Sequence, residues 1–404
     1  MLTPRSGPPS IGRLPIHVVR MRFRSPLRCV LALLCLLTAV FVAWQMWLRP
    51  VGDRTGSVPQ ALPDGWRRST PRAEGFDEAA LASSLRRLTD GPYNVHSVLV
   101  ERNGRLVAEI YQGGSDRSVY SLLSVRRRIG PNDLHDVRSV GKSVTGLLYG
   151  IALAEGKVPA PARRLSTVFP QLDAGAASNA RQTTVRDLLD MTSGLVWREG
   201  APGSNDELRL FWKRDLPGYV LGHSRAAPAG STFNYNGGGT ALLAQLITAG
   251  TGLPLDRYVQ QRLFGPLGIT EWEWVEDLHG RPMAFNGLRV TPRGLLKLGR
   301  LVQDDGRWNG RQIVPRAWIR DSWAPGHPTE VADFRYRGQW WAGTVTWKGR
   351  ELPWHAAFGN GGQRLFIIPE LDVVLVTTAG AYDHVPTAIA VNRLVQDVAS
   401  SVRE

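Results

Sequence analysis

Cysteine is scarce in this sequence, because the 404 residues contain only Cys29 and Cys35. Two cysteines exclude a disulfide scaffold and a cysteine-rich zinc site. A chain of this length can bury a large core without such links. Hydrophobic residues make up 43% and charged residues 21%, which excludes a disordered chain, a coiled coil and a collagen-like protein. The composition predicts a globular protein with room for two parts.

Acidic residues are absent from residues 1–50, which contain seven arginines. This segment supplies half of the formal net charge of +14 and leaves +7 for the rest of the chain. The total charge alone would suggest nucleic-acid binding, but a basic segment beside a membrane span explains half of it. We therefore expect no nucleic-acid partner. Lysine is also scarce and occurs only at positions 142, 157, 213, 297 and 348.

A run of twenty uncharged residues, CVLALLCLLTAVFVAWQMWL (29–48), follows the basic segment 1–28. This length is sufficient for a helix that crosses a bilayer, and the preceding arginines favour a cytoplasmic N-terminus. We expect a single-pass anchor in the inner membrane, with the following domain in the periplasm. A cleaved signal peptide followed by secretion is the alternative. Residues 49–75 are rich in Pro, Gly, Arg and Ser and are interpreted as a linker.

Strand patterns at both ends of the remaining chain bracket a helical middle. Residues 96–114 predict a hairpin with Asn103-Gly104 as its two-residue turn, and short apolar segments after residue 330 predict further strands. Helical periodicity dominates in between. The predicted fold class is α+β: an antiparallel β-sheet flanked by helices, with an inserted all-α subdomain. The predicted domain covers 76–404, with the α/β part at 76–138 and 286–404 and the helical part at 139–285.

Several common site motifs are missing. Gly141-Lys142-Ser143 resembles the end of a phosphate-binding loop, but Asp136 stands where that loop requires its first glycine. No serine has the G-x-S-x-G spacing, and no H-E-x-x-H occurs. The pair His135-Asp136 ends a stretch (125–136) interpreted as a polar loop, and we interpret the pair as a loop contact rather than a metal site. We expect no metal and no organic cofactor.

The segment Ser139-Val140-Gly141-Lys142 places a serine and a lysine on one face of a helical turn. A serine at a helix start lies among unpaired backbone N–H groups. A neighbouring lysine that is desolvated loses its proton more easily and can act as a base. The alternative is an ordinary surface helix. The scarcity of lysine and the apolar helix that follows favour a nucleophile with its base.

The segment HDVRSVGKSVTGLLYGIALAEGKV resembles the active-serine helix of the serine β-lactamase-like and penicillin-binding hydrolases. Further blocks resemble that family in the same order, over roughly residues 70–400. The branch that the chain resembles most contains family VIII-type esterases and 6-aminohexanoate-dimer hydrolases. These blocks are TTVRDLLDMTSGL (183–195), PAGSTFNYNGGGTALLAQLI (228–247), PLGIT (266–270), the helix from Thr291, and FGNGGQRLFIIPELDVVLV (358–376).

The resemblance implies a role for each matching residue. Ser139 would be the nucleophile that forms the acyl-enzyme, and Lys142 its general base or proton shuttle. Tyr235 would relay a proton to and from the leaving group, although a packed aromatic is the alternative. The backbone N–H groups of Ser139 and Asn360 would form the oxyanion hole.

Two motifs depart from the family pattern. The usual Y-x-N is here Tyr235-Asn236-Gly237, so its amide side chain is missing. The usual K-T-G or H-x-G is here Ala357-Phe358-Gly359, which lacks the cation and the hydroxyl that help to bind the carboxylate of penicillins and D-alanyl peptides. The backbone donor at Asn360 does not depend on side-chain identity and is retained. These departures argue against β-lactamase and D,D-peptidase activity.

Residues near these motifs are candidates for the substrate pocket. Four tryptophans in segments expected to border the cleft would favour an apolar substrate group, with core packing as an equal alternative. Glu199 is a candidate polar group at the rim. His355 or Arg364 is a candidate for the missing charge, although a histidine facing away is the favoured interpretation. The tryptophans are Trp197, Trp340, Trp341 and Trp354, and the predicted pocket contains Asn236, Gly237, Trp197, Phe358, Gly359 and His355.

The sequence therefore predicts a membrane-anchored serine hydrolase that cleaves an ester or amide of a small or peptide-like substrate. A β-lactamase or D,D-peptidase is one alternative. A non-catalytic cell-wall-binding or sensor module on the same scaffold is another, against which stands the retention of Ser139, Lys142 and Tyr235 together.

Overall fold

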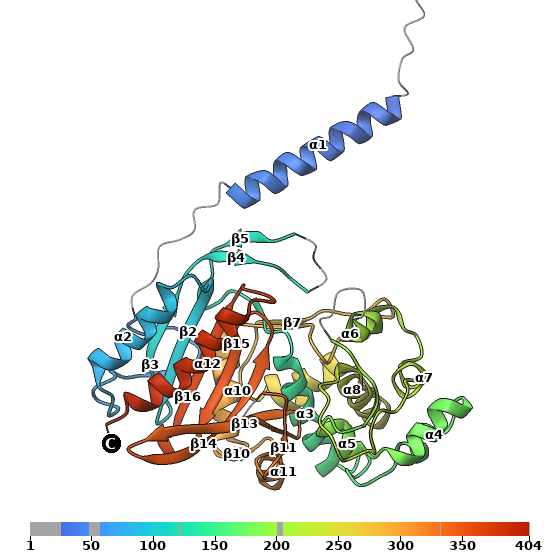
Figure 1. Ribbon diagram of the computed structural model, residues 1–404. Coiled ribbons are helices and arrows are strands. Elements are labelled where there is room, and N and C mark those ends of the chain that lie inside the picture. The colour runs from blue at the N-terminus through green and yellow to red at the C-terminus, as the bar shows by residue number, and fades with distance from the viewer. Residues whose placement is uncertain are drawn as a thin grey trace, which may run out of the picture. The chain divides into compact units, whose positions relative to one another are not determined.

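The computed structural model describes residues 26–47, 57–119, 121, 123–199, 205–331 and 333–403, which fall into two units with their boundary after Leu48 (Figure 1). The first unit contains one helix, α1 (Pro26–Trp47). Among the described residues, no helix has the length and apolarity that a membrane span requires. The predicted segments 1–28 and 49–75 lie partly outside the described residues. Position 48, the last residue of the predicted span, also lies outside them.

A nine-stranded sheet forms the centre of the second unit, in the order β1-β3-β2-β16-β15-β14-β13-β12-β11. All pairings are antiparallel except that of the edge strand β1 with β3, so the predicted purely antiparallel sheet is wrong at that edge. The strands are β1 (Arg67–Arg68), β2 (Val95–Arg102), β3 (Arg105–Tyr111), β11 (His327–Pro328), β12 (Arg335–Arg337), β13 (Trp340–Trp347), β14 (Arg350–Gly359), β15 (Gln363–Ile368) and β16 (Val373–Ala379).

Both faces of the sheet are covered, which explains the continuous apolar runs of its central strands. On β15, Leu365 and Ile367 join one hydrophobic cluster, whereas Phe366 and Ile368 join the other. Helices α2 (Glu78–Thr89) and α12 (Val385–Ser400) cover the second face, and α10 (Pro292–Gln303) covers the first (Figure 1). The prediction of strands from both chain ends is confirmed by the pairing of β2 with β16.

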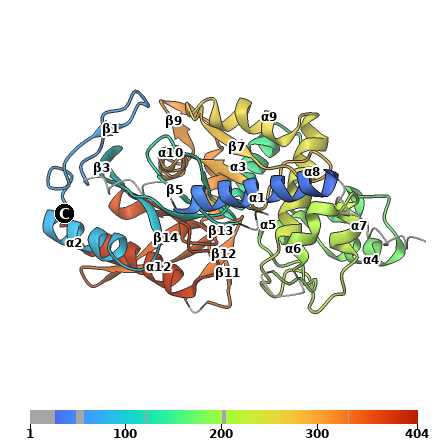
Figure 2. The same cartoon turned by 90° about the horizontal axis from the view of Figure 1, so that it is seen from above.

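The helical segments gather at one end of the sheet (Figure 2). This part is not all-α as predicted, because β7 (Trp272–Trp274) joins β6 (His135–Asp136) and β8 (Leu288–Val290) in a small sheet. The helices are α3 (Val140–Ala154), α4 (Ala174–Gln182), α5 (Val185–Leu189), α6 (Asp206–Arg209), α7 (Leu216–Leu221), α8 (Gly237–Thr251) and α9 (Leu255–Val259), with short helices at Leu165–Thr167, Leu210–Trp212 and Gln260–Phe264.

Two other stretches are more ordered than the sequence predicts. The polar stretch 125–136 contributes β5 (Val125–Arg127), which pairs with β4 (Gly114–Asp116), as well as β6. The described end of the predicted linker packs on the domain, because Asp64 forms an ion pair with buried Arg293. The remaining elements are β9 (Arg307–Trp308), β10 (Arg311–Gln312), α11 (Arg316–Ser322) and a short helix at Pro369–Leu371.

Candidate active site

Ser139 is the N-cap residue of α3, and its side chain makes no capping hydrogen bond. Instead, its hydroxyl oxygen accepts a hydrogen bond of 3.0 Å from Lys142 Nζ, one helical turn away. The turn before the helix is fixed by Asp136, whose carboxylate accepts the backbone N–H of Arg138 at 3.0 Å. Arg138 has a left-handed backbone with φ of 51°. The Ser139 hydroxyl is therefore hydrogen-bonded to Lys142 instead of to the backbone N–H groups at the start of α3.

Two carboxylates accompany Lys142, whose side chain is only 1% exposed. Its Nζ lies 2.8 Å from Glu207 Oε2 and 3.8 Å from Glu199 Oε2. Burial alone would lower the pKa of Lys142, but Glu199 and Glu207 outweigh it and raise the pKa. Lys142 is therefore an ammonium at rest, which differs from the deprotonated lysine expected from the sequence because the motif did not reveal these two carboxylates.

Glu199 and Glu207 are held by donors from three parts of the chain. Trp197 Nε1 donates to Glu199 Oε1 at 2.9 Å, and the backbone N–H of Gly237 donates to the same oxygen. Asn286 Nδ2 donates to Glu207 Oε1 at 2.9 Å. Burial, followed by the nearby Glu207, raises the pKa of Glu199, so that this carboxyl tends to hold a proton.

Gly237 explains why two carboxylates fit beside Lys142. A Cβ at this position would overlap with Glu207 Oε2 and would lie 3.0 Å from Glu199 Oε1. The missing side chain in Tyr235-Asn236-Gly237 thus leaves the space that the carboxylates occupy. Glycine at position 237, which departs from the family pattern, is therefore required by Glu199 and Glu207, which we call the acidic pair.

The Tyr235 ring lies beside the lysine, with Lys142 Nζ 4.7 Å from the ring centroid. Burial raises the pKa of the Tyr235 phenol, although Lys142 and a hydrogen bond with Ser139 oppose this. The phenol therefore carries its proton at rest. Trp341 packs against Tyr235 with 5.6 Å between ring centroids, which fixes the phenol beside Ser139.

The backbone at Asn360 follows directly after β14. A Cβ on Gly359 would overlap with the carbonyl oxygen of Val137, so only glycine lets the end of β14 approach the chain before Ser139 so closely. The Asn360 side chain is held by Asp383 through hydrogen bonds of 2.7 and 2.9 Å. Ser139 and Asn360 both line the same cleft.

This cleft has a volume of about 600 Å³ and is lined by apolar rings and by charges of both signs. Arg364 is buried in its wall, 4.3 Å from the Phe358 ring centroid, and its Nη1 donates to Gly359 O at 2.9 Å. Burial lowers the pKa of Arg364 to about 9, and its hydrogen-bond partners among the described residues are neutral, with Nε donating to Asn392 Oδ1 at 2.8 Å. Other lining residues include Arg117, Arg138, Ser139, Glu199, Glu207, Tyr235, Asn286, Trp341, Phe358, Gly359, Asn360 and Asp383.

The other predicted pocket residues do not line this cleft. The Asn236 side chain caps α8 by accepting the Gly239 N–H at 3.1 Å. His355 is buried and stacks on Trp323, with 4.4 Å between ring centroids. Trp197 is buried behind Glu199. Of the four tryptophans, Trp341 lines the cleft, whereas Trp340 and Trp354 are core residues.

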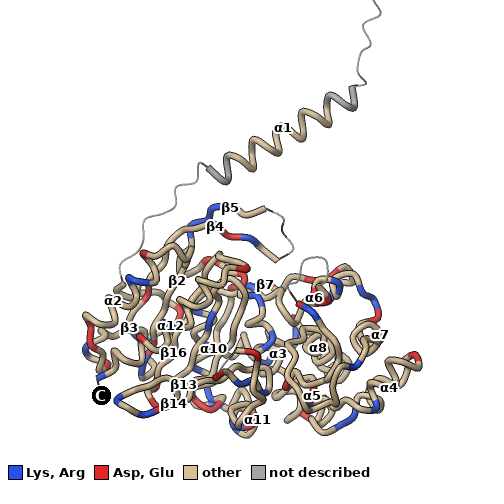
Figure 3. Tube along the Cα trace, viewed as in Figure 1, with Lys and Arg blue, Asp and Glu red and all other residues tan. Residues whose placement is uncertain are grey.

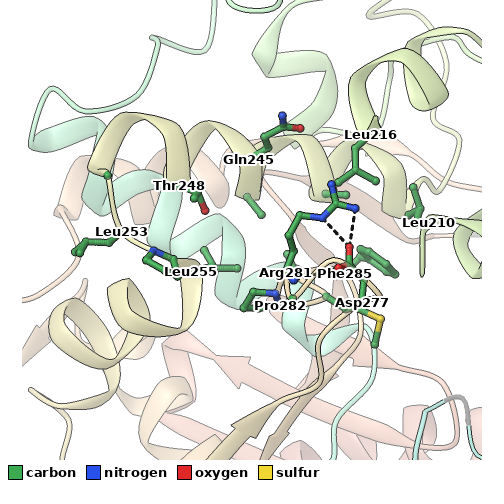
Figure 4. Close-up of a pocket in the computed structure, with 17 residues that line it drawn as sticks. Leu210, Leu216, Gln245, Thr248, Leu253, Leu255, Asp277, Arg281, Pro282 and Phe285 are labelled. Atoms are coloured by element: carbon green, nitrogen blue, oxygen red, sulfur yellow. Dashed lines mark hydrogen bonds and ion pairs between the residues drawn. The ribbon is translucent and has the colours of Figure 1, made fainter. Parts of the chain in front are cut away.

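A second cavity of about 340 Å³ lies between α8 and residues 277–285 (Figure 4). Its wall is mainly apolar, with Leu216 and Leu253 among its residues, and Arg281 pairs with Asp277 at 2.7 Å. It contains none of the predicted catalytic side chains.

Sequence reasoning missed Glu207 and Asn286. Glu207 lies 65 residues from Lys142, on a four-residue helix without a motif. Asn286 follows an irregular segment, and its Oδ1 accepts no hydrogen bond among the described residues. Glu199 was a candidate from the sequence, whereas the sequence signal for Glu207 is indirect, namely the glycine at position 237.

Comparisons with known proteins show the family to which the chain belongs. The family model named Beta-lactamase matches residues 94–399. The 6-aminohexanoate-dimer hydrolase of Paenarthrobacter ureafaciens is 25% identical over 299 residues, which cover 69% of this chain and 70% of that protein.

Solved structures show the same fold. A penicillin-binding protein homologue from Caulobacter crescentus superposes with a TM-score of 0.62 at 16% identity, over 86% of this chain and 99% of that one. A class C β-lactamase superposes with a TM-score of 0.60 at 16% identity, over 81% and 98% of the two chains.

Proposed function

Because this chain belongs to the beta-lactamase family, we propose that it is a serine hydrolase that cleaves an ester or amide through an acyl-enzyme on Ser139. The observation that carries the proposal is the hydrogen bond of 3.0 Å between Lys142 Nζ and Ser139 Oγ at the wall of the cleft, with Tyr235 beside both. A nucleophile, a proton carrier and a phenol within reach of one reacting carbonyl are the groups that acyl transfer requires.

The acidic pair solves the problem that Lys142 is charged at rest. The Lys142 ammonium first passes a proton to Glu207 Oε2, 2.8 Å away. The neutral amine then takes the Ser139 proton as the Ser139 oxygen attacks the carbonyl carbon. The first step neutralises one positive and one negative charge, so the net charge of the buried site is unchanged.

The remaining steps use Tyr235 and the backbone donors. The N–H groups of Ser139 and Asn360 stabilise the oxyanion as the tetrahedral intermediate forms. Tyr235 gives its proton to the leaving group and regains one from Lys142. Water then attacks the acyl-enzyme, and its proton returns through the same groups to free Ser139.

The cleft favours a substrate with an apolar chain and a negative end. Trp341 and Phe358 present ring surface, whereas buried Arg364 has only neutral hydrogen-bond partners among the described residues. A substrate carboxylate would pair with the positive charge of the Arg364 guanidinium. The rings and the guanidinium together favour a linear substrate that ends in a carboxylate. The 6-aminohexanoate-dimer hydrolase to which the chain is similar is named for such a substrate.

Purified full-length chain offered a short-chain nitrophenyl ester, a linear amide dimer and a chromogenic cephalosporin tests the proposal. We expect turnover of the amide dimer that Ser139→Ala abolishes, whereas the exposed control Ser231→Ala retains it. Unchanged turnover in Ser139→Ala would refute the mechanism. Hydrolysis of the cephalosporin alone would establish the β-lactamase alternative.

The non-catalytic alternative predicts a chain that binds without reacting. A fluorophosphonate probe should label Ser139 within the intact protein, as shown by mass spectrometry of the modified peptide. No labelling, together with no turnover, would favour a binding or sensor module.

We further propose that residues 29–48 attach the chain to the inner membrane and that the catalytic domain lies outside the cytoplasm. The twenty uncharged residues behind a basic segment support this. Alkaline extraction should leave the full-length chain in the membrane fraction. Release of a shorter chain would indicate the cleaved signal, and recovery of the intact chain in the soluble fraction would contradict both.

A further inference from the structure

Three buried polar side chains, none of them among the catalytic groups, meet at the junction of three strands. They are His96 on β2, Asp116 on β4 and His135 on β6, with exposed fractions of 0%, 2% and 0%. One side-chain nitrogen or oxygen from each residue lies within 4.8 Å of those of the other two. The sequence interpretation of His135 as a loop contact did not include the two partners, which come from distant segments.

The hydrogen bonds of His135 define which of its nitrogens carries the proton. Its Nδ1 lies 3.0 Å from the backbone carbonyl oxygen of Asp136. A carbonyl oxygen can only accept, so Nδ1 carries the hydrogen. In a neutral imidazole the other nitrogen, Nε2, then presents a lone pair.

The same reasoning applies to His96 through Asn94. Asn94 Nδ2 donates to the Ser115 carbonyl at 2.7 Å, and the Ser115 N–H donates to Asn94 Oδ1 at 3.2 Å. This pair of hydrogen bonds defines the orientation of the amide, so the atom that lies 3.2 Å from His96 Nε2 is the acceptor Oδ1. His96 Nε2 therefore carries the hydrogen, and Nδ1 presents a lone pair.

These two lone-pair nitrogens face each other. His96 Nδ1 and His135 Nε2 are 2.8 Å apart, a distance at which one hydrogen must lie between hydrogen-bonded nitrogens. With both outer nitrogens already protonated, two neutral imidazoles cannot supply it. A cation between or beside the nitrogens resolves this conflict.

Asp116 is placed to complete such a site. Its Oδ1 accepts from the Tyr382 hydroxyl at 2.7 Å, and its Oδ2 accepts from Arg127 Nη1 at 3.0 Å. Each carboxylate oxygen has a second lone pair that these bonds leave for a ligand. The carboxylate thus provides a third donor on the side of the two imidazoles.

We propose that His96 Nδ1, His135 Nε2 and a carboxylate oxygen of Asp116 bind one divalent transition-metal ion, zinc by preference. Two imidazoles and one carboxylate are a common zinc ligand set, with metal–ligand distances of about 2.0–2.2 Å. Tetrahedral coordination would separate the two nitrogens to roughly 3.3 Å, a small rotation of each ring. The carbonyl of Asp136 and Asn94 Oδ1 hold the outer N–H groups, as partners of metal-bound histidines usually do.

The location suggests that the ion stabilises the wall that carries the nucleophile. Its ligands connect β2 and β4 to β6, which ends three residues before Ser139. Tyr382, the partner of Asp116, also packs under Arg138, whose guanidinium carbon lies 4.2 Å from the ring centroid. The ion therefore has a structural role and takes no part in the acyl transfer proposed above.

The test uses the intact chain and measures metal rather than turnover. After treatment with a chelator, calorimetric titration with zinc chloride should show one site per chain, and the bound zinc should persist through gel filtration and be counted by mass spectrometry. Zinc should also raise the thermal unfolding temperature. His96→Gln and Asp116→Asn should weaken zinc binding by more than the roughly 10–100-fold that loss of an outer partner costs. The exposed control His279→Gln should bind as the wild type does.

Asp116→Asn keeps the side-chain shape and an acceptor for Tyr382, so it tests the site even where His96→Gln fails to fold. Failure of the wild type to retain zinc or to unfold at a higher temperature would overturn the proposal. In that case ¹⁵N spectra of the imidazoles should show a shared proton instead. Equal zinc binding in wild type and both variants would also overturn it, because the ion would then lie elsewhere.

Discussion

Two buried polar clusters include residues of the chain segment 135–142, and they differ in whether a side chain provides a central cation. In the first cluster, Lys142 provides a cation between Glu199 and Glu207. In the second, the donors of His96, His135 and Asp116 converge, and Arg127 pairs with Asp116, but no described side chain supplies a cation between the two imidazoles. The first cluster has an internal cation that can move a proton, whereas the second is organised around a cation from outside. The difference separates a reactive site from a structural one on the same stretch of chain.

The largest expected effect follows from removing the internal cation. Lys142→Met leaves the acidic pair without its counter-ion and Ser139 without its proton carrier. We expect kcat/KM to fall by roughly 10²–10⁴-fold, the usual contribution of a positioned acid or base. Steady-state kinetics on the amide dimer measure this, with Lys157→Met as the exposed control. Activity within twofold of the wild type would mean that Lys142 carries no proton.

Glu207→Gln tests which group receives the lysine proton. The amide cannot accept a proton, so kcat should fall by roughly 10²-fold if Glu207 is the acceptor. Loss of the charge also removes one cause of the raised pKa of Lys142. If the neutral Lys142 amine acted as the base without help from Glu207, activity of the variant would instead rise at neutral pH, because a larger fraction of Lys142 would be neutral. A pH profile of kcat separates the two outcomes, with exposed Glu351→Gln as the control.

Gly237→Asn restores the family's Y-x-N motif and tests whether the glycine and the acidic pair belong together. The new Cβ would overlap with Glu207 Oε2, so the carboxylate must move away from Lys142. We expect a loss of about 1–3 kcal/mol in the free energy of unfolding, measured by urea denaturation. Gly175→Asn, which has space for a side chain, is the control. Unchanged stability would show that Glu207 already lies elsewhere.

The smallest effect concerns the second cluster. Asn94→Asp keeps an acceptor opposite His96 Nε2 and makes it anionic, which strengthens the imidazole as a ligand, although the donor to the Ser115 carbonyl is lost. We expect zinc affinity to increase by less than about tenfold, as measured by calorimetry. A decrease would indicate that the Asn94 orientation inferred from Ser115 does not control the His96 proton.

The sequence predicted those features that depend on local patterns. The turn Asn103-Gly104 has positive φ at both residues, as a two-residue hairpin requires. The helix around Ser139 and the pairing of strands from the two chain ends were also predicted. Figure 3 shows basic and acidic residues interspersed along the described trace of the second unit.

The parts that could not be predicted depend on contacts between distant segments. Glu207 reaches Lys142 across 65 residues, and His96 reaches His135 across 39. Single residues on short elements leave no periodic pattern, so their chemistry is visible only after folding. The protonated state of Lys142 was mispredicted for the same reason, because burial was foreseen and its counter-charges were not.

The pairing of β2 with β16 also governs when the protein can fold during synthesis. Ser97 on β2 meets Thr378 on β16, 281 residues later, through hydroxyls 2.7 Å apart. The centre of the sheet is therefore incomplete until almost the whole chain has left the ribosome, and loop closure over such a distance slows folding. Chains that end before about residue 380 lack both a central strand and α12. Prematurely terminated products should consequently remain unfolded and open to proteolysis, so that only full-length chains become hydrolases.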